Sequence, residues 1–305
     1  MIFNAFPGLA MALAITLAAV CPPARAESAV RPYVLEGTEV HHIPSKILPR
    51  EYDIFVSLPE SYATSKQRYP VLFTTDANYA FPVIRSINRR VGADGRNLQE
   101  FILVALSYAK GDSPTFSRNR DYTPTDIDLK KTREDDQDGK VYGQAEPYRR
   151  HVAEEVFPYV ERHFRADMSR KVFAGHSYGA LFGAHVLLTT PAMFDSYVLS
   201  SPSLWFDKHY IFEAERRYAA AHKDLPARVL LLAASYEAVR PNAKDKRYAR
   251  KGADIIVDMK AFEKQLKAHH YASLAVRSEV IPEEDHLSAF PSAITRGLLW
   301  AFGKT

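Results

Sequence analysis

The pentapeptide Gly175-His176-Ser177-Tyr178-Gly179 constrains the fold of this chain more than any other feature. The apolar stretch Arg170–Ala174 before it predicts a buried strand, and the stretch Ala180–Leu188 after it predicts a helix. A serine in a Gly-x-Ser-x-Gly sequence between a strand and a helix occupies a strained turn, and its glycines let strand and helix pass close together. Such a turn lifts the hydroxyl above the sheet edge, at the positive end of the helix. The pattern therefore predicts that Ser177 is a nucleophile; the alternative is a tight turn whose serine only caps the helix.

The first 26 residues differ in composition from the rest of the chain. Leu9–Val20 is an uncharged run, and Ala24-Arg25-Ala26 places small residues where a signal peptidase reads. The run is too short to span a bilayer comfortably. We therefore expect residues 1–26 to be a signal peptide, residues 27–305 to form one exported α/β domain, and no membrane insertion after cleavage.

Composition excludes several classes of site. Cleavage would remove Cys21, the only cysteine of the 305 residues, so the mature chain would have no disulfide, thiol nucleophile or thiolate metal site. The formal net charge is only +4, and no stripe of Lys and Arg marks a nucleic-acid surface. Neither an H-E-x-x-H metal motif nor a G-x-x-x-x-G-K-[ST] phosphate loop is present in the sequence. We expect no metal, no other cofactor and no nucleic-acid partner.

Apolar periodicity predicts an alternating order of strands and helices. The expected strands besides the one before Ser177 are Arg50–Leu58, Tyr69–Thr75, Glu100–Leu106, Asp195–Ser200, Arg228–Ala234 and Ala275–Ile281. Helical spacing predicts helices over Pro147–Phe164, kinked at Pro158, and over Asp254–His270. Such an order forms a doubly wound, mostly parallel α/β sheet, and no linker divides the chain.

Four segments carry a resemblance to a known family. They are Tyr69–Asn78, Arg120–Thr125, Gly175–Phe182 and Ser201–Trp205. With them the chain resembles the esterase D branch of the α/β hydrolases and, within it, the periplasmic esterases that open enterobactin-type and salmochelin-type trilactone siderophores. Ala77 and Ala180 stand where that branch commonly has glycine, and both are small enough to keep the backbone path. The resemblance implies an α/β-hydrolase fold for residues 27–305.

A serine nucleophile needs a base, and His286 is the first candidate. It follows the last expected strand directly, which is where α/β hydrolases place their base after the acid in chain order. Siderophore esterases have a histidine in the matching position. Glu237 follows the strand Arg228–Ala234 and is the candidate for the carboxylate that orients the imidazole. Other candidates for that carboxylate are Asp254, Asp258 and Asp285, and a Ser-His dyad without any carboxylate stays open.

The oxyanion of an ester reaction needs donors that face the serine. We expect the backbone N–H of Tyr178 to be one of them. The second should come from the loop after the strand Tyr69–Thr75, where Ala77 or Asn78 is the candidate by position and by resemblance. Loss of one such donor typically lowers the rate about 100- to 1000-fold.

Aromatic and basic residues near strand ends are candidates for substrate contacts. Trp205 offers a stacking face for a catechol ring, and Arg118 and Arg120, on the loop after Leu106, offer guanidinium groups for anionic oxygens. The alternatives are that Trp205 fills the core and that Arg120 pairs with Asp121 or another carboxylate.

The residues and the resemblance together imply a serine esterase in the periplasm. Its expected substrate is a ferric catecholate trilactone siderophore of the enterobactin type, cleaved for iron release without a cofactor. The alternatives are a general carboxylesterase that acts on acyl or feruloyl sugar esters and a periplasmic siderophore-binding protein without turnover. The sequence does not indicate an oligomeric state.

Overall fold

The computed structural model describes residues 1–2, 31–92, 96–127, 141–248 and 251–304. The chain divides into two units, Met1–Leu35 and Glu36–Thr305. All described helices and strands belong to the second unit. The expected signal peptide, residues 1–26, lies outside the described residues except for its first two positions.

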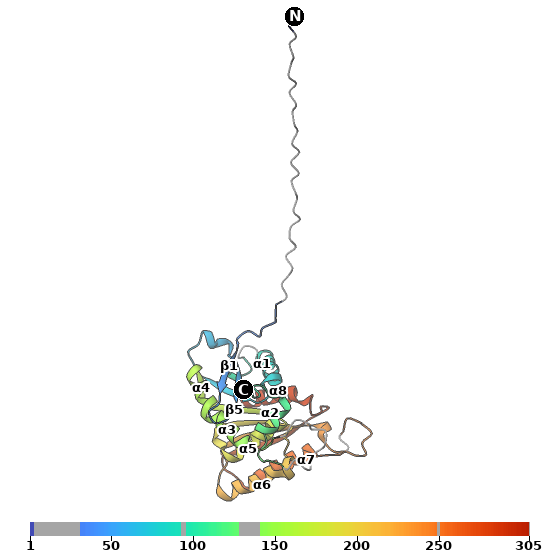
Figure 1. Ribbon diagram of the computed structural model, residues 1–305. Coiled ribbons are helices and arrows are strands. Elements are labelled where there is room, and N and C mark those ends of the chain that lie inside the picture. The colour runs from blue at the N-terminus through green and yellow to red at the C-terminus, as the bar shows by residue number, and fades with distance from the viewer. Residues whose placement is uncertain (3–30, 93–95, 128–140, 249–250, 305) are drawn as a thin grey trace. The chain divides into compact units, whose positions relative to one another are not determined.

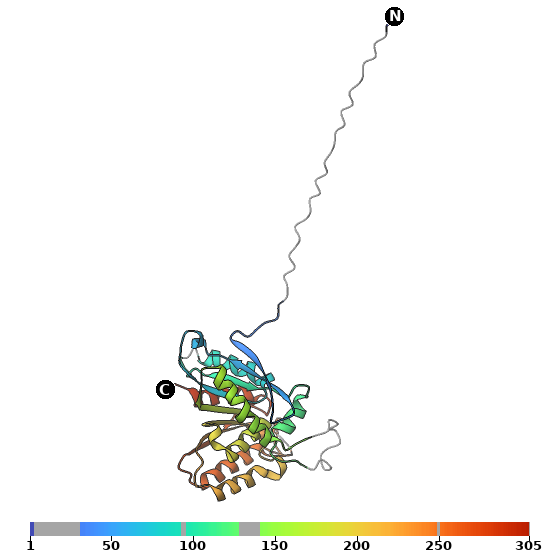
Figure 2. The same cartoon turned by 60° about the vertical axis from the view of Figure 1, so that its left-hand side comes forward.

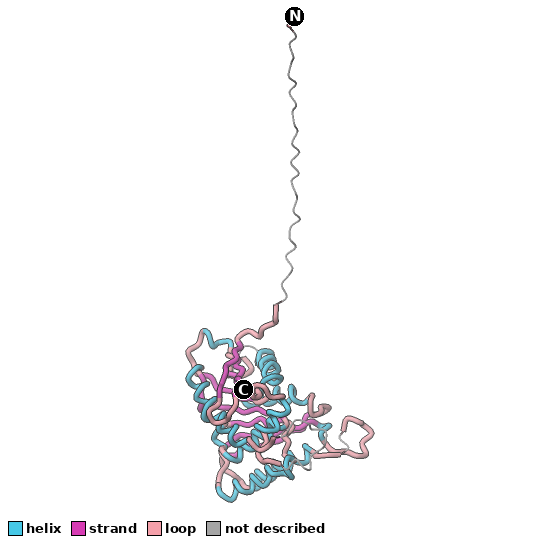
Figure 3. Tube along the Cα trace, in the orientation of Figure 1, coloured by secondary structure: helices cyan, strands magenta, loops and turns pink. Residues whose placement is uncertain are grey.

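An eight-stranded sheet forms the centre of the second unit (Figure 3). Its strands are β1 (Thr38–Pro44), β2 (Glu51–Ser57), β3 (Tyr69–Thr74), β4 (Ile102–Leu106), β5 (Ala166–His176), β6 (Ser196–Ser200), β7 (Ala227–Ala234) and β8 (Leu274–Ile281). In space they follow the order β1-β2-β4-β3-β5-β6-β7-β8. β2 is antiparallel to β1 and β4, and the other neighbours are parallel. The predicted doubly wound, mostly parallel sheet is confirmed, and the carboxyl ends of β3 to β8 lie along one edge.

Helices cover both faces of this sheet (Figures 1 and 2). They are α1 (Ala77–Gly92), α2 (Pro114–Asp121), α3 (Ala145–His151), α4 (Phe157–His163), α5 (Tyr178–Thr189), α6 (Phe206–Ala221), α7 (Ile255–Ala268) and α8 (Ala289–Phe302). α1 and α8 bury their apolar side chains in one cluster, and α5 and α7 bury theirs in a second cluster on the opposite face. β5 lies between the two apolar layers, so its carboxyl end is held rigidly. None of the described helices is long and apolar enough to cross a membrane.

The region predicted as one kinked helix over Pro147–Phe164 consists of three pieces. α3 and α4 are joined by a π-helical turn, Val152–Val156, in which the N–H of Phe157 donates to the carbonyl of Val152. Pro158 lies in the first turn of α4 and has no N–H to donate to the preceding turn. The wider turn therefore sits where the missing donor interrupts the helical ladder.

The segment after β4 is a helix where the sequence analysis placed a loop. α2 begins at Pro114, and the side chain of Ser113 caps it by accepting a hydrogen bond of 3.2 Å from the N–H of Phe116. Proline suits the first position of a helix because the N–H there has no intrahelical partner. α2 carries both arginines that were predicted to contact substrate, and the helical geometry decides which of them faces the active-site region.

Candidate active site

Ser177 occupies the strained turn between β5 and α5 that the sequence predicts. Its backbone has φ 58° and ψ −117°, a conformation that L residues rarely adopt. A Cβ atom at Gly175 would lie 2.5 Å from the backbone carbon of Gly179, and one at Gly179 would overlap the Thr75 hydroxyl. Both glycines are thus required sterically, one for the crossing of strand and helix and the other for contact with the end of β3.

A chain of hydrogen bonds links Ser177 to two other side chains from separate strand ends. The Ser177 hydroxyl lies 3.0 Å from Nε2 of His286, in the loop between β8 and α8. Nδ1 of His286 lies 2.6 Å from Oε1 of Glu237, which ends a 3₁₀ turn after β7. Because an ionised carboxylate only accepts hydrogen bonds, Nδ1 carries the proton and Nε2 is free to accept from the serine.

Glu237 is fixed by contacts on its other carboxylate oxygen. Oε2 accepts hydrogen bonds from the backbone N–H of Ala234 at 2.7 Å and from the Ser201 hydroxyl at 2.9 Å. The side chain is buried, and these two donors leave Oε1 as the oxygen that faces His286. The carboxylate therefore sets both the orientation and the tautomer of the imidazole.

The other carboxylates considered from the sequence have different partners. Asp254 caps α7 by accepting from the N–H of Val257, and Asp258 lies 3.0 Å from the ring of His209. Asp285 accepts from backbone N–H groups of the loop that carries His286. None of these contacts orients the imidazole, so the structure brings Glu237 alone of the four candidates to His286.

His176 supports the site from within the elbow. Its buried ring donates to or accepts from the Ser200 hydroxyl at 3.0 Å and lies 4.8 Å from the ring of His286. Burial, followed by the charges of His286 and Arg118, lowers the pKa of His176 to about 3. The ring is neutral near pH 7 and packs against the base without competing with it for a proton.

The expected oxyanion donors lie at the starts of two helices. Tyr178 is the first residue of α5, and Ala77 and Asn78 are the first two residues of α1. N–H groups in the first turn of a helix have no intrahelical acceptor, and the helix dipole makes that end positive. The contact between Gly179 and Thr75 brings these two helix starts together beside Ser177.

A cavity of about 540 Å³ opens over Ser177. Its lining is largely aromatic and apolar and consists of Tyr79, Val83, Tyr108, Pro114, Thr115, Arg118, His176, Ser177, His286, Leu287, Phe290 and Pro291. Of the predicted substrate-binding residues, Arg118 is in this lining. The sequence analysis missed Tyr79 and Tyr108, although both follow closely after the carboxyl ends of strands that border the site, β3 and β4.

Buried Asp76 organises the polar side of this cavity. Its Oδ1 accepts from Arg118 Nε at 2.7 Å and from the Tyr108 hydroxyl at 2.8 Å, and its Oδ2 accepts from the Tyr79 hydroxyl at 3.3 Å. Burial and the Asp76 charge raise the pKa of both tyrosines, which stay neutral donors. Asp76 lies just before α1 with a left-handed φ of 61°, so the turn that starts α1 also aims this carboxylate.

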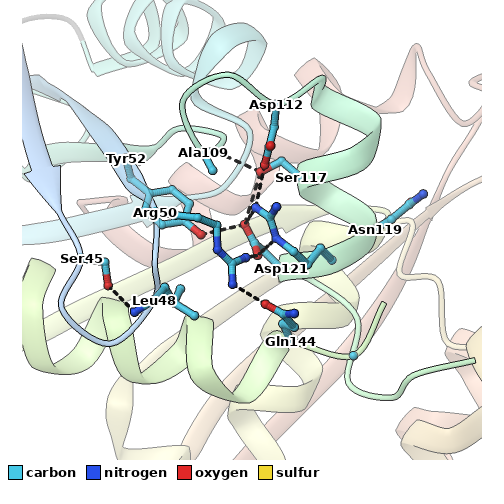
Figure 4. Close-up of polar contacts among 12 residues, drawn as sticks. Ser45, Leu48, Arg50, Tyr52, Ala109, Asp112, Ser117, Asn119, Asp121 and Gln144 are labelled. Carbon is cyan, nitrogen blue, oxygen red and sulfur yellow. Dashed lines mark hydrogen bonds and ion pairs between the residues drawn. The ribbon is translucent and has the colours of Figure 1, made fainter. Parts of the chain in front are cut away.

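Arg120, predicted to contact substrate, lies elsewhere. Its guanidinium is only 7% exposed and binds Asp121 at 2.8 and 3.0 Å and Asp112 at 2.7 Å. Figure 4 shows Asp121 at the centre of this cluster, where it also accepts from Arg50 and Tyr52 at 2.9 Å each. The prediction for Arg120 is corrected: this arginine is the structural partner of Asp121 because α2 turns it to the side away from the cavity.

Trp205 neither fills the core nor lines the cavity. It is 38% exposed, and its ring lies 6.2 Å from that of Tyr178. A nearer neighbour of the nucleophile, which the sequence analysis did not single out, is Ser203, whose hydroxyl lies 3.4 Å from that of Ser177. Ser203 and Trp205 both belong to the segment Ser201–Trp205. The sequence analysis identified this segment, but it did not identify Ser203 as the residue that contacts Ser177.

The fold and this arrangement define a serine hydrolase of the α/β-hydrolase class. Residues 45–273 match the family model named Esterase, with the description "Putative esterase", and the chain belongs to this family. It is 31% identical over 210 residues to the ferri-bacillibactin esterase BesA of Bacillus subtilis, covering 67% of this chain and 72% of that protein. It is also 31% identical to the siderophore enterobactin esterase of Emericella nidulans, covering 55% of this chain and 58% of that protein. The crystal structure of the BES protein from Bacillus cereus superposes with a TM-score of 0.75 at 22% identity, over 90% of this chain and all of that one.

Proposed function

We propose that the chain hydrolyses ester bonds of a siderophore with Ser177 as nucleophile. The observation that carries this proposal is the hydrogen-bonded series Ser177–His286–Glu237 at the floor of an open cavity. Ser177 Oγ attacks the ester carbonyl while Nε2 of His286 takes its proton, and Glu237 stabilises the resulting imidazolium. The imidazolium then gives that proton to the leaving alkoxide, which leaves an acyl group on Ser177. Water, activated by the same Nε2, releases the acid and restores the serine.

The developing negative charge on the carbonyl oxygen needs fixed donors. We assign this role to the backbone N–H of Tyr178 and to that of Ala77 or Asn78, because all three lie in the first turns of α5 and α1. Donors of this kind are held by the helices before substrate arrives, so no reorganisation is needed during the reaction.

The substrate class is proposed from the relatives and from the cavity wall. The relatives with 31% identity are named as esterases of ferri-bacillibactin and enterobactin. Arg118 offers the free part of its guanidinium to an anionic oxygen, and the rings of Tyr79, Tyr108 and Phe290 offer faces for a catechol. We therefore propose a ferric catecholate trilactone as substrate.

Three substrates test this proposal. Purified protein should release acid from a ferric catechol trilactone and from p-nitrophenyl butyrate, and should prefer the trilactone over feruloyl sugar esters. Activity on feruloyl sugars alone would make the chain a general carboxylesterase. Binding of the trilactone without turnover of any ester would make it a binding protein and would refute the catalytic proposal.

Arg118 provides the matched test of the anion contact. Charge-assisted hydrogen bonds contribute about 1.5–3 kcal/mol, so Arg118→Gln should lower turnover of the ferric trilactone about tenfold or more. Turnover of neutral p-nitrophenyl butyrate should change little, and Arg118→Lys should keep part of the ferric activity. Equal losses on both substrates would assign Arg118 to the scaffold through Asp76.

Export is part of the proposal and rests on the composition of residues 1–26. We propose that these residues direct the chain to the periplasm, where an iron-loaded siderophore still needs opening. The mature protein in the periplasmic fraction should begin near Glu27 and contain no thiol. Intact-mass measurement decides this, and a chain that begins at Met1 or carries lipid on Cys21 would overturn it.

A further inference from the structure

The sheet ends in a long edge strand. β8 pairs in parallel with β7 along its whole length, from Leu274 opposite Ala227 to Ile281 opposite Ala234. Its other edge pairs with no strand among the described residues. Ala275 and Arg277 are exposed, so neither α7 nor α8 covers the strand at these two positions. An open edge of this kind presents unpaired N–H and C=O groups that accept a further strand.

A groove of about 400 Å³ follows the amino-terminal half of that edge. Leu274–Arg277 contribute to it, Trp300 borders it from α8, and the residues that border it at the end of α7 are Leu266, Lys267, His270 and Tyr271. Because α7 and α8 lie on opposite faces of the sheet, the groove surrounds the strand edge rather than entering the core. Its charged lining is basic and consists of Arg228, Lys267 and Arg277, of which Lys267 also pairs with Glu263.

The other half of the same edge is acidic. Glu279 lies two residues after Arg277, and the chain continues from β8 with Glu283, Glu284 and Asp285. The central sequence Val276-Arg277-Ser278-Glu279-Val280 reads symmetrically about Ser278, with the two charges of opposite sign at matching places. A strand with this pattern is complementary to a second copy of itself that runs in the opposite direction.

We propose that two copies of this chain pair along β8, antiparallel, with the twofold axis at Ser278. In this register Arg277 of each copy faces Glu279 of the other, and Val276 faces Val280. Residues directly opposite in an antiparallel pair lie close enough for such charge pairs to be attractive. The basic groove of each copy then receives the acidic end of the other, and the interface is isologous, as closed dimers require.

The charges also exclude neighbouring registers. An axis at Arg277 or at Glu279 would place like charges directly opposite each other, which destabilises a strand pair. Charged residues on an edge strand commonly prevent it from pairing with any other strand. The competing explanation is therefore that Arg277 and Glu279 protect the edge from aggregation. Glu279 already pairs with Arg296 of α8, and that partner can share the carboxylate with Arg277 of the second copy.

Two single charge reversals test the register. Arg277→Glu makes the edge wholly acidic and Glu279→Arg makes it wholly basic, so each variant alone should raise the dimer dissociation constant about tenfold or more. An equimolar mixture should form a heterodimer, because both facing pairs are again of opposite sign. Arg162→Glu, an exposed reversal on α4 at another part of the surface, is the matched control and should dimerise as wild type does.

Sedimentation equilibrium of wild type, the single variants and their mixture gives the result, with circular dichroism as the check of folding. The proposal expects a wild-type dimer that weakens at high salt, two variants that dimerise about tenfold or more weakly, and a mixture that dimerises more tightly than either variant alone. A wild type that stays monomeric at its highest soluble concentration overturns it and supports the guard against aggregation. Two variants that dimerise as tightly as wild type place the interface elsewhere, and a mixture that dimerises no more tightly than either variant alone refutes the register.

Discussion

Replacement of Glu237 by glutamine changes one atom at the position that faces His286. The N–H of Ala234 can only donate, and it points at the second oxygen of the carboxylate at 2.7 Å. In the Glu237→Gln variant the amide oxygen must stay on that donor, because an NH₂ group there would oppose an N–H. The NH₂ group therefore faces Nδ1 of His286, which must lose its proton to accept. The proton moves to Nε2, and the imidazole can no longer accept from Ser177.

The expected loss follows from this change of tautomer. An asparagine in place of the orienting aspartate lowers kcat about 10⁴-fold in a serine protease with the same arrangement, which corresponds to about 5.5 kcal/mol of transition-state stabilisation. We expect a loss of that order for Glu237→Gln with little change in the free energy of unfolding. Glu237→Ala should also lose activity, but it leaves Ala234 N–H and Ser201 without their acceptor. Each buried group left unsatisfied costs about 1–3 kcal/mol of stability.

Steady-state kinetics on p-nitrophenyl butyrate, chemical denaturation and ¹⁵N NMR of His286 give the three readouts. The NMR signals should show the proton on Nδ1 in wild type and on Nε2 in Glu237→Gln. A glutamine variant that keeps more than a tenth of wild-type kcat, or that keeps the proton on Nδ1, would refute the orienting role. The site would then act as a Ser-His dyad.

Three further expectations concern the same site. Ser177→Ala and His286→Ala should each abolish esterase activity, and the double variant should lose little more; additive losses in kcat would contradict a shared mechanism. The folded-state pKa of His176 is lowered, so below its unfolded pKa near 6.5 the unfolded chain binds the extra proton. Wild type should therefore lose about 2–3 kcal/mol more unfolding free energy between pH 7.5 and 4.5 than His176→Gln, and equal losses in urea titrations would contradict the buried neutral ring. Gly179→Ala should lower the melting temperature because its Cβ overlaps Thr75, and an unchanged Tm would contradict that contact.

The sequence predicted the centre of the fold because short-range patterns determine it. The strand, the strained serine and the helix are consecutive, so Ser177 needed no knowledge of distant contacts. His286 and Glu237 could be predicted for a similar reason, since each follows closely after the end of an expected strand. The sequence did not show how far Ser177, His286 and Glu237 lie from one another, because the hydrogen bonds among them depend on the order of the strands in the sheet.

Arg118 and Arg120 have different roles because the segment that carries them is a helix and not a loop. As loop residues, Arg118 and Arg120 were equivalent candidates. In a helix, residues two apart point to nearly opposite sides, so only one can face the cavity. Arg120 turns to the buried side, where it binds its neighbour Asp121, which the sequence suggested as the alternative partner, and also Asp112.

Several elements escaped the sequence analysis for identifiable reasons. α1 has a proline at position 82, which argues against a helix interior. β1 is an edge strand whose residues are mostly polar, so it lacks the apolar alternation that signals a strand. The aromatic wall of the cavity was missed with them, because Tyr79 belongs to α1.

The Asp121 cluster determines which parts of the molecule can unfold independently. α2 is only eight residues long, and its last carboxylate is bound by Arg50 and Tyr52, which lie just before and within β2. Removal of one partner from a buried ion pair costs about 3–5 kcal/mol, so α2 does not detach while β2 stays in place. Helix and sheet margin thus belong to one cooperative unit of hydrogen exchange. α2, which carries Arg118, therefore unfolds only together with the antiparallel end of the sheet. The side of the cavity that Arg118 lines is in place before substrate enters.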